Sequence, residues 1–291
     1  MKRVAFGIAA GLLGLAMPAC GDTAAQKTWA LGAGAETPDA DNWRAVDPAN
    51  LLVFETTKGR VLVETFPEMA PKHFAQFTKI IRAGDLDATT FHRVIDDFMA
   101  QGGDVWAKKG ADPGWPGIPG EFTIRRDVAA MPLDAMIGPE DTGKMGYLKG
   151  FPMLTQPSFF AEMSADGFVG TSIPHCRGVL STARTDDPNS ADTQFFLMRE
   201  HSPHLDKMYT SWGRVIDGQS VVKALKKGAP GSGSVTDPDL LTSVRIAADI
   251  PEAKRPKAWV LRTDTDAFAA ELATMGEVDV CDLPAVPAMV K

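Results

Sequence analysis

The clearest alternation of hydrophobic and polar residues begins after position 50. Residues 51–57 and 60–66 are rich in aliphatic and β-branched side chains, and Lys58-Gly59 separates them, which predicts a β-hairpin. A helix is expected next, because Pro71 suits a first helical turn and Gly84 suits a helix end. Between them apolar residues recur at helical spacing: Phe74, Phe77, Ile80 and Ile81.

Short strand-like runs continue along the rest of the chain. They lie at 89–95, 98–101, 178–183, 194–198, 209–216 and 241–247. A second, short helix is expected at 221–225, closed by Gly228. Seven or eight short strands with two helices make the chain mainly β and favour a closed β-barrel capped by the helices.

Three segments lie outside this pattern. Residues 105–177 hold many prolines and glycines and no long periodic stretch, which predicts a loop-rich insertion that packs on the domain or has a function. Residues 26–50 are typical of a linker. The C-terminal extension, 251–291, contains a strand-like run at 258–261 and an expected helix at 264–275.

The N-terminus, residues 1–25, has the layout of a secretory signal peptide. Met1-Lys2-Arg3 is positively charged, and the apolar residues 4–17 are too few to span a bilayer comfortably. Cys20 stands where a bacterial lipoprotein would be cleaved and lipidated, although ordinary cleavage nearby fits as well. We therefore expect a periplasmic protein, with a lipid anchor as its only candidate link to the membrane.

The net charge and the cysteines limit the partners and cross-links that we expect. A net charge of −7 over 291 residues argues against a nucleic-acid partner, which would need a basic face. Cys176 and Cys281 could form a disulfide in an oxidising compartment, which would tie the C-terminal extension to the main body, or they could remain separate thiols. Nothing in the sequence indicates oligomers, so we expect a monomer.

The candidate chemistry centres on one arginine among apolar residues. Arg93 lies within a few positions of Phe91, Phe98, Met99 and Gln101. A second apolar group follows about a hundred residues later. It consists of Gln194-Phe195-Phe196, with Leu205 and Tyr209 close behind.

The run from Phe91 to Asp104 resembles the signature of the cyclophilins at almost every discriminating position. The hairpin, the first helix, residues 178–189, Gln194-Phe195-Phe196 and Trp212-Gly213-Arg214-Val215 are similar to that family too. The resemblance covers about 51–122 and 178–250. It implies a closed eight-stranded antiparallel barrel with two capping helices, and peptidyl-prolyl cis/trans isomerase activity on proline-containing clients.

The resemblance also implies roles for individual residues. Arg93 would donate hydrogen bonds to the twisted amide, Gln101 would orient Arg93 and hold the substrate backbone, and Phe98 would belong to the same catalytic group. The other residues expected to bind substrate are Met99, Ala183, Arg184, Thr185, Phe196, His204, Leu205 and Tyr209. His204 departs from the tryptophan or phenylalanine of other members, and Arg184 makes the groove edge more polar.

Other polar residues are expected to be structural. Strand alternation points His92 away from the face of Arg93. His201 and His204 have no evident third ligand, so we expect no metal site, and rotation about an amide bond needs no cofactor. Two alternative functions stay open: a non-catalytic peptide-binding or chaperone module of the cell envelope, suggested by the long insertion, and an envelope scaffold lipoprotein.

Overall fold

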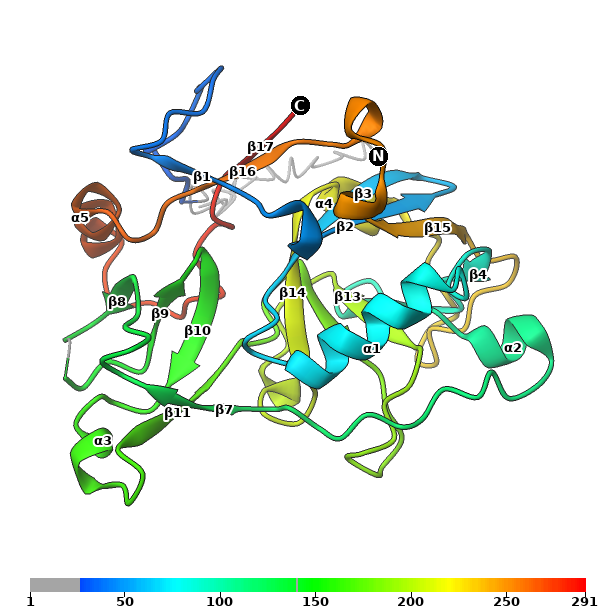
Figure 1. The fold of residues 1–291 in the computed structure, drawn as a ribbon, viewed down its shortest axis with the longest axis horizontal. Coiled ribbons are helices and arrows are strands. Elements are labelled where there is room, and N and C mark those ends of the chain that lie inside the picture. Colours follow the sequence, from blue (N-terminus) through cyan, green and yellow to red (C-terminus); the bar gives the residue numbers. More distant parts are fainter. Residues whose placement is uncertain (1–26, 140) are drawn as a thin grey trace, which may run out of the picture.

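The computed structural model describes residues 27–139 and 141–291. The expected signal peptide and Cys20 lie outside these residues. Figure 1 shows two parts, a curled nine-stranded sheet with helix α1 across it and a group of smaller sheets beside it. Within the described residues, no helix is both long enough and apolar enough to cross a membrane.

The nine-stranded sheet is antiparallel throughout, with the strand order β4-β15-β2-β3-β14-β12-β13-β6-β5. Its strands are β2 (Leu51–Thr56), β3 (Gly59–Thr65), β4 (Thr89–Thr90), β5 (Arg93–Val94), β6 (Met99–Gly102), β12 (Val179–Thr182), β13 (Phe195–Met198), β14 (Ser211–Asp217) and β15 (Leu240–Ile246). The predicted hairpin is therefore confirmed as β2 and β3.

The predicted closed eight-stranded barrel is not confirmed. The sheet has nine strands, and its two edge strands, β4 and β5, are not paired with each other. The expected strand at 89–95 breaks at Phe91-His92, so that β4 pairs with β15 while β5 pairs with β6. The two halves of one predicted strand thus become the two edges of the sheet. The chain passes directly from one edge to the other, which shows how strongly the sheet is curled.

Both faces of this sheet are buried. Along β2, Leu52 and Phe54 join one apolar cluster with helices α1 (Pro71–Arg82) and α4 (Gln219–Ala224), while Leu51 and Val53 join a second cluster on the other face. Side chains alternate between the faces of a strand, which accounts for this division. The predicted helix is confirmed as α1, whose Phe77 packs against Trp212 with 4.9 Å between ring centroids.

The insertion is more regular than its sequence indicates. It forms a sheet of order β7-β11-β10-β9-β8 with one short helix, Phe160–Met163, beside β11, whereas the helix Val105–Lys109 lies apart from this sheet (Figure 1). The elements are α2 (Val105–Lys109), β7 (Ile124–Asp127), β8 (Ala135–Ile137), β9 (Met145–Leu148), β10 (Phe151–Thr155), α3 (Phe160–Met163) and β11 (Phe168–Ser172). Pro152 is tolerated within β10 because β11 pairs only with Leu154 and Thr155, further along that strand.

The segment predicted as a linker, 26–50, packs against the C-terminal extension at Trp43–Ala45 and at Trp29. β1 (Trp43–Ala45) pairs with β16 (Ala258–Leu261), and β16 pairs with β17 (Ala288–Val290). Trp29 is buried and stacks on Phe268 of α5 (Asp266–Thr274). The partners of these residues lie more than 200 positions away, so local pattern could not reveal them. The predicted strand at 258–261 and the helix after it are confirmed.

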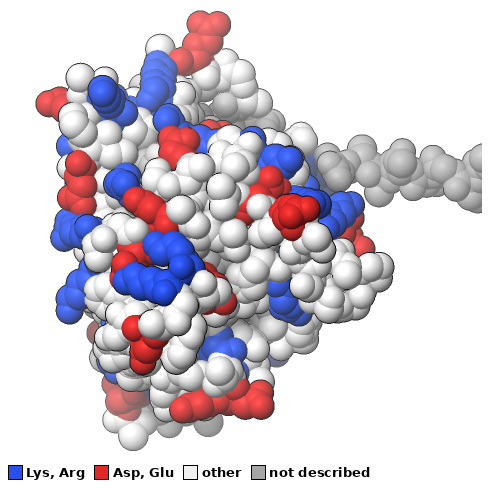
Figure 2. Space-filling view, turned by 90° about the vertical axis from the view of Figure 1, so that its right-hand side faces the viewer, with Lys and Arg blue, Asp and Glu red and all other residues white. Residues whose placement is uncertain are grey.

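Short 3-10 helices complete the fold. They are η1 (Pro48–Asn50), η2 (Pro203–Leu205), η3 (Ala247–Asp249) and η4 (Glu252–Lys254). On the side of the molecule that carries α2, Figure 2 shows acidic and basic side chains interspersed, with neutral surface between them.

The smaller sheets and α5, which we call the accessory lobe, are tied to the nine-stranded sheet by a buried ion network. Glu64 of β3 accepts hydrogen bonds from Arg44 of β1 at 2.6 Å and from Arg214 of β14 at 3.2 Å. The Arg214 guanidinium also lies 5.1 Å from the ring centroid of Phe151 in β10. Burial lowers the pKa of Arg214, and Glu64 opposes that shift. A disulfide between Cys176 and Cys281 forms a second link.

Replacing Glu64 by glutamine should destabilise the protein by about 3–5 kcal/mol, because the substitution leaves buried Arg214 without its counter-charge. Urea unfolding measures the difference. Glu55→Gln on neighbouring β2 is the matched control, because its ion pair with Arg60 is exposed, and the expected loss is below about 1 kcal/mol. Equal losses in the two variants would contradict the role assigned to Glu64.

Candidate active site

Sheet register brings the candidate catalytic residues together. Arg93 of β5 stands opposite Gln101 of β6, Gln101 stands opposite Phe196 of β13, and Phe196 stands opposite Ser181 of β12. We call this the cross-strand row. Because side chains directly opposite one another in an antiparallel pair lie on the same face, residues from four strands share one surface. The adjacent residues along these strands, such as Ala100 in β6 and Phe195 in β13, turn to the other face.

Arg93 is held from two sides. Its Nη1 donates to Gln101 Oε1 at 3.3 Å, and its Nε donates to the backbone oxygen of Ser232 at 3.1 Å. Gln101 is oriented in turn, because its Nε2 donates to Gln194 Oε1 at 2.9 Å. The guanidinium lies 5.9 Å from the ring centroid of Phe98. Within the described part of the chain, Nη2 of Arg93 makes no hydrogen bond, so a donor remains for a ligand.

The predicted pocket residues form one continuous apolar surface beside Arg93. Met99, Phe196 and Leu205 are buried, and Phe98 packs against them while half-exposed. Phe98 also lies against His204 of η2, with 5.4 Å between ring centroids. The structure therefore gathers residues that are up to 107 positions apart in the chain, Phe98 and Leu205, into one wall.

The groove edge is more constrained than its sequence indicates. Arg184 donates from Nε and Nη2 to the backbone oxygen of Met208, at 3.0 and 2.8 Å, and lies 4.5 Å from the ring centroid of Tyr209. Its side chain is thus occupied in joining two loops. Ala183 is half-buried beside the apolar wall, and Thr185 is exposed.

Glycine geometry explains the end of the signature run. Gly103 has φ +80°, and a Cβ there would lie 2.7 Å from the backbone oxygen of Thr193. The next residue, Asp104, caps α2, because its carboxylate accepts from the amide of Ala107 at 2.8 Å. The run that carries Gln101 is therefore held at its end by a tight turn and a helix cap.

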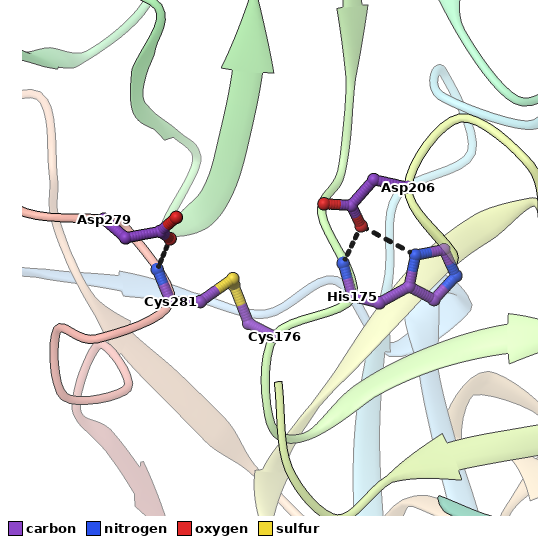
Figure 3. The surroundings of a disulfide bond; sticks show 5 residues. All are labelled: His175, Cys176, Asp206, Asp279 and Cys281. Carbon is purple, nitrogen blue, oxygen red and sulfur yellow. Dashed lines mark hydrogen bonds and ion pairs between the residues drawn. A yellow bond between two sulfur atoms is a disulfide. The ribbon is translucent and has the colours of Figure 1, made fainter. Parts of the chain in front are cut away.

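One supporting residue could not be found from the sequence. His175 is fully buried, and its ring lies parallel to Phe196 with 6.0 Å between centroids. Its Nδ1 is 3.0 Å from Asp206 Oδ1, and its Nε2 is 3.1 Å from Ser181 Oγ. Figure 3 shows the Asp206 carboxylate bridging the ring and the backbone amide of His175. His175 lies in the insertion, where no periodicity marks it.

His92 and Glu121 differ in how their side chains are paired. His92 Nδ1 is buried without a hydrogen-bond partner among the described residues, so the hydrogen-bonded role expected for its ring is not seen at that atom. Glu121 lies 2.7 Å from Nδ1 of buried His73 on α1 and accepts from two amides of the same helix. It thereby fastens the start of the insertion to α1.

The comparisons with known proteins agree with this geometry. Residues 51–247 match the sequence profile of the family described as "Cyclophilin type peptidyl-prolyl cis-trans isomerase/CLD". A protein of Brucella abortus described as "Probable peptidyl-prolyl cis-trans isomerase" is 36% identical over 207 residues, covering 70% of this chain and 86% of its own. A peptidyl-prolyl cis-trans isomerase of Synechococcus elongatus is 29% identical over 201 residues, covering 68% and 96% of the two chains.

A solved structure resembles nearly the whole molecule. The crystal structure of a cyclophilin from Hirschia baltica superposes with a TM-score of 0.80 at 44% sequence identity, covering 86% of this chain and 94% of its own. The chain belongs to the cyclophilin-type peptidyl-prolyl cis-trans isomerase family, and it is an enzyme of that class. Because the match to the Hirschia protein extends beyond 51–247, it includes much of the accessory lobe.

The buried histidines predict a pH dependence of stability. Burial lowers the pKa of His175 and of His73, although Asp206 and Glu121 partly oppose the shift. The unfolded chain therefore binds protons below about pH 6.5 that the folded chain does not. Stability is full above that pH and falls as the pH drops towards the lowered pKa, by up to about 1.4 kcal/mol per pH unit for each histidine.

Urea unfolding between pH 7.5 and 5.5 measures this slope. His175→Gln should make the slope shallower by about one proton's contribution, whatever its effect on absolute stability. Thr242→Ala is the control, since Thr242 is exposed and carries no titrating group, so the slope should stay as in the wild type. A His175→Gln slope equal to that of the wild type would contradict the buried, neutral state of His175.

Proposed function

We propose that the enzyme accelerates X–Pro rotation by holding the proline ring on the apolar wall while Arg93 donates a hydrogen bond to the twisting amide. The observation that carries this proposal is the cross-strand row, in which Arg93 and Gln101 lie beside Phe196 on one face. The wall formed by Phe98, Met99, Phe196 and Leu205 supplies the place for the ring.

Rotation about the X–Pro bond requires the protein mainly to position the substrate and one hydrogen-bond donor. The barrier of roughly 18–20 kcal/mol arises from the partial double bond between carbonyl carbon and nitrogen. When that bond twists, resonance is lost and the nitrogen lone pair becomes available as a hydrogen-bond acceptor. A guanidinium N–H directed at that nitrogen is bound more strongly in the twisted state than in either planar isomer, which lowers the barrier. No bond is broken and no proton needs to be transferred.

Two features support Arg93 in this role. A guanidinium offers several donors in a rigid fork. Gln101 and Ser232 use two of its N–H groups, which fixes the fork before substrate arrives. A proline ring seated on the apolar wall would exclude water from this side of Arg93, so the remaining donor would act in a medium of lower polarity.

Arg93→Ala should lower kcat/KM for isomerisation of an Ala-Pro peptide by about 10²–10³-fold, the usual effect of losing one donor to a transition state. Arg93→Lys should be impaired as well, since it lacks the fork. Magnetisation exchange between the cis and trans peptide signals in NMR measures the rate without a coupling enzyme.

The control is Arg125→Ala. Arg125 is an exposed arginine of β7 in the accessory lobe, paired with Asp166, so its loss should leave the rate unchanged. Circular dichroism shows whether each variant is folded. A folded Arg93→Ala protein with wild-type activity would refute the proposed mechanism.

We further propose that the clients are exported proteins in the periplasm. The signal-like residues 1–25 support this, and so does the disulfide, which is typical of oxidising compartments. Fusing residues 1–30 to alkaline phosphatase, which is active only after export, tests it. We expect an active fusion; an inactive one would contradict export. Comparing Cys20 with Cys20→Ala in membrane fractions then distinguishes a lipid anchor from a soluble form.

A further inference from the structure

A group of metal-ligand side chains surrounds the disulfide, away from the active site. His201, Asp279 and Cys281 each place one ligand atom within 4.8 Å of the others. His201 follows β13, whereas Asp279 and Cys281 lie between α5 and β17. Figure 3 shows Asp279 beside Cys281, and Cys281 bonded to Cys176 on the facing segment. From the sequence alone, His201 and His204 have no evident third ligand, because Asp279 and Cys281 lie about 80 positions further on.

We propose that reduction of the disulfide turns this cluster into a Zn²⁺ site. Its ligands are the sulfurs of Cys176 and Cys281, an imidazole nitrogen of His201 and a carboxylate oxygen of Asp279. Four ligands of these types match a tetrahedral zinc site, with bonds of about 2.3 Å to sulfur and about 2.0–2.2 Å to nitrogen and oxygen. In such a site the ligand atoms lie roughly 3.3–3.8 Å apart, so the ligand atoms of His201, Asp279 and Cys281 need to approach one another by about 1 Å, while the two sulfurs move apart once their bond is reduced.

The oxidised and metal-bound states exclude one another. Disulfide sulfur carries no thiolate charge, and the thiolate is the form of cysteine that binds metals. A dithiol reductant supplies two electrons and two protons, so its own sulfurs become a disulfide while Cys176 and Cys281 become thiols. Zinc then displaces the two thiol protons, which are released to solvent.

The surroundings allow a metal ion and a reductant to enter. A cavity of about 460 Å³ is lined by Cys176, Cys281 and His201 among others. Asp279 is exposed, and His201 and Cys281 are half-exposed. Among the other charged residues that line this cavity, Glu200 and Asp282 oppose Lys27 and Arg177, and Arg214 is paired with Glu64. The two thiolates and Asp279 would therefore determine the local potential and favour a cation.

Zinc would replace the disulfide as a cross-link. Both join the C-terminal extension to Cys176, and zinc would also include His201, on the segment that leads to η2. Cys176 directly follows His175, which supports Phe196 and Asp206 in the active site. The disulfide in the oxidised chain, or zinc in the reduced chain, would therefore fix the segment that carries His175, which supports Phe196 of the apolar wall.

The decisive experiment titrates the full chain with Zn²⁺ against a chromophoric chelator, once oxidised and once after reduction by a phosphine under argon. We expect one zinc per reduced chain and none per oxidised chain. Cobalt(II) should give thiolate charge-transfer absorption and tetrahedral d–d bands in the reduced chain alone. Zinc should also raise the melting temperature of the reduced chain without changing that of the oxidised chain.

Variants identify the ligands. Cys281→Ser removes one of the two thiolates, so it should lower the intensity of the cobalt charge-transfer bands by at least half. His201→Ala and Asp279→Asn should each weaken zinc binding by about 10-fold or more. Asp282→Asn, an exposed carboxylate next to Cys281, and Cys20→Ser are the controls and should bind zinc as the wild type does. Asp279→Asn alters an exposed residue, so it tests the site even if a cysteine variant fails to fold.

The proposal is overturned if the reduced wild-type chain takes up no zinc, or if the oxidised chain binds it equally well. Unchanged affinity in folded Asp279→Asn and His201→Ala variants would also overturn it. These outcomes do not depend on isomerase activity, so failure here would leave the proposed function untouched.

Discussion

The pairing of Arg93 with Gln101 across β5 and β6 is the contact on which the active site depends. It aligns the cross-strand row with Phe196 and Ser181, and it places Met99 on the same face, two residues from Gln101. A slip of one residue would turn Arg93 or Gln101 to the opposite, fully apolar face. Because Val94, Ala100 and Phe195 are buried on that opposite face, the apolar core itself maintains the register.

The accessory lobe packs on the face that carries this row. Glu64 and Arg214 form a second pair of cross-strand neighbours there, and Arg44 reaches them from β1. The disulfide ends at Cys176, next to the histidine that lies behind Phe196. The contacts that attach the lobe therefore meet the sheet beside the residues that form the apolar wall.

The sequence predicts an element well when the residues that it contacts lie close to it in the chain. The hairpin and α1 depend on neighbours close in the chain, and pattern alone indicates them, whereas the signature run is identified by its resemblance to the cyclophilins. The strands β7 to β11 are short and interrupted by proline and glycine, and β1 needs a partner more than 200 residues away. His175, Ser232 and the cluster around His201 become meaningful only through distant contacts, so no local signal marks them.

A crystal structure of the enzyme with a bound Ala-Pro peptide tests the central claim most directly. The account predicts the proline ring against Phe98, Met99, Phe196 and Leu205, with an Arg93 N–H about 2.7–3.2 Å from an acceptor atom of the prolyl amide. A peptide seated on the accessory lobe, or on the wall with Arg93 directed away from the amide, would contradict it.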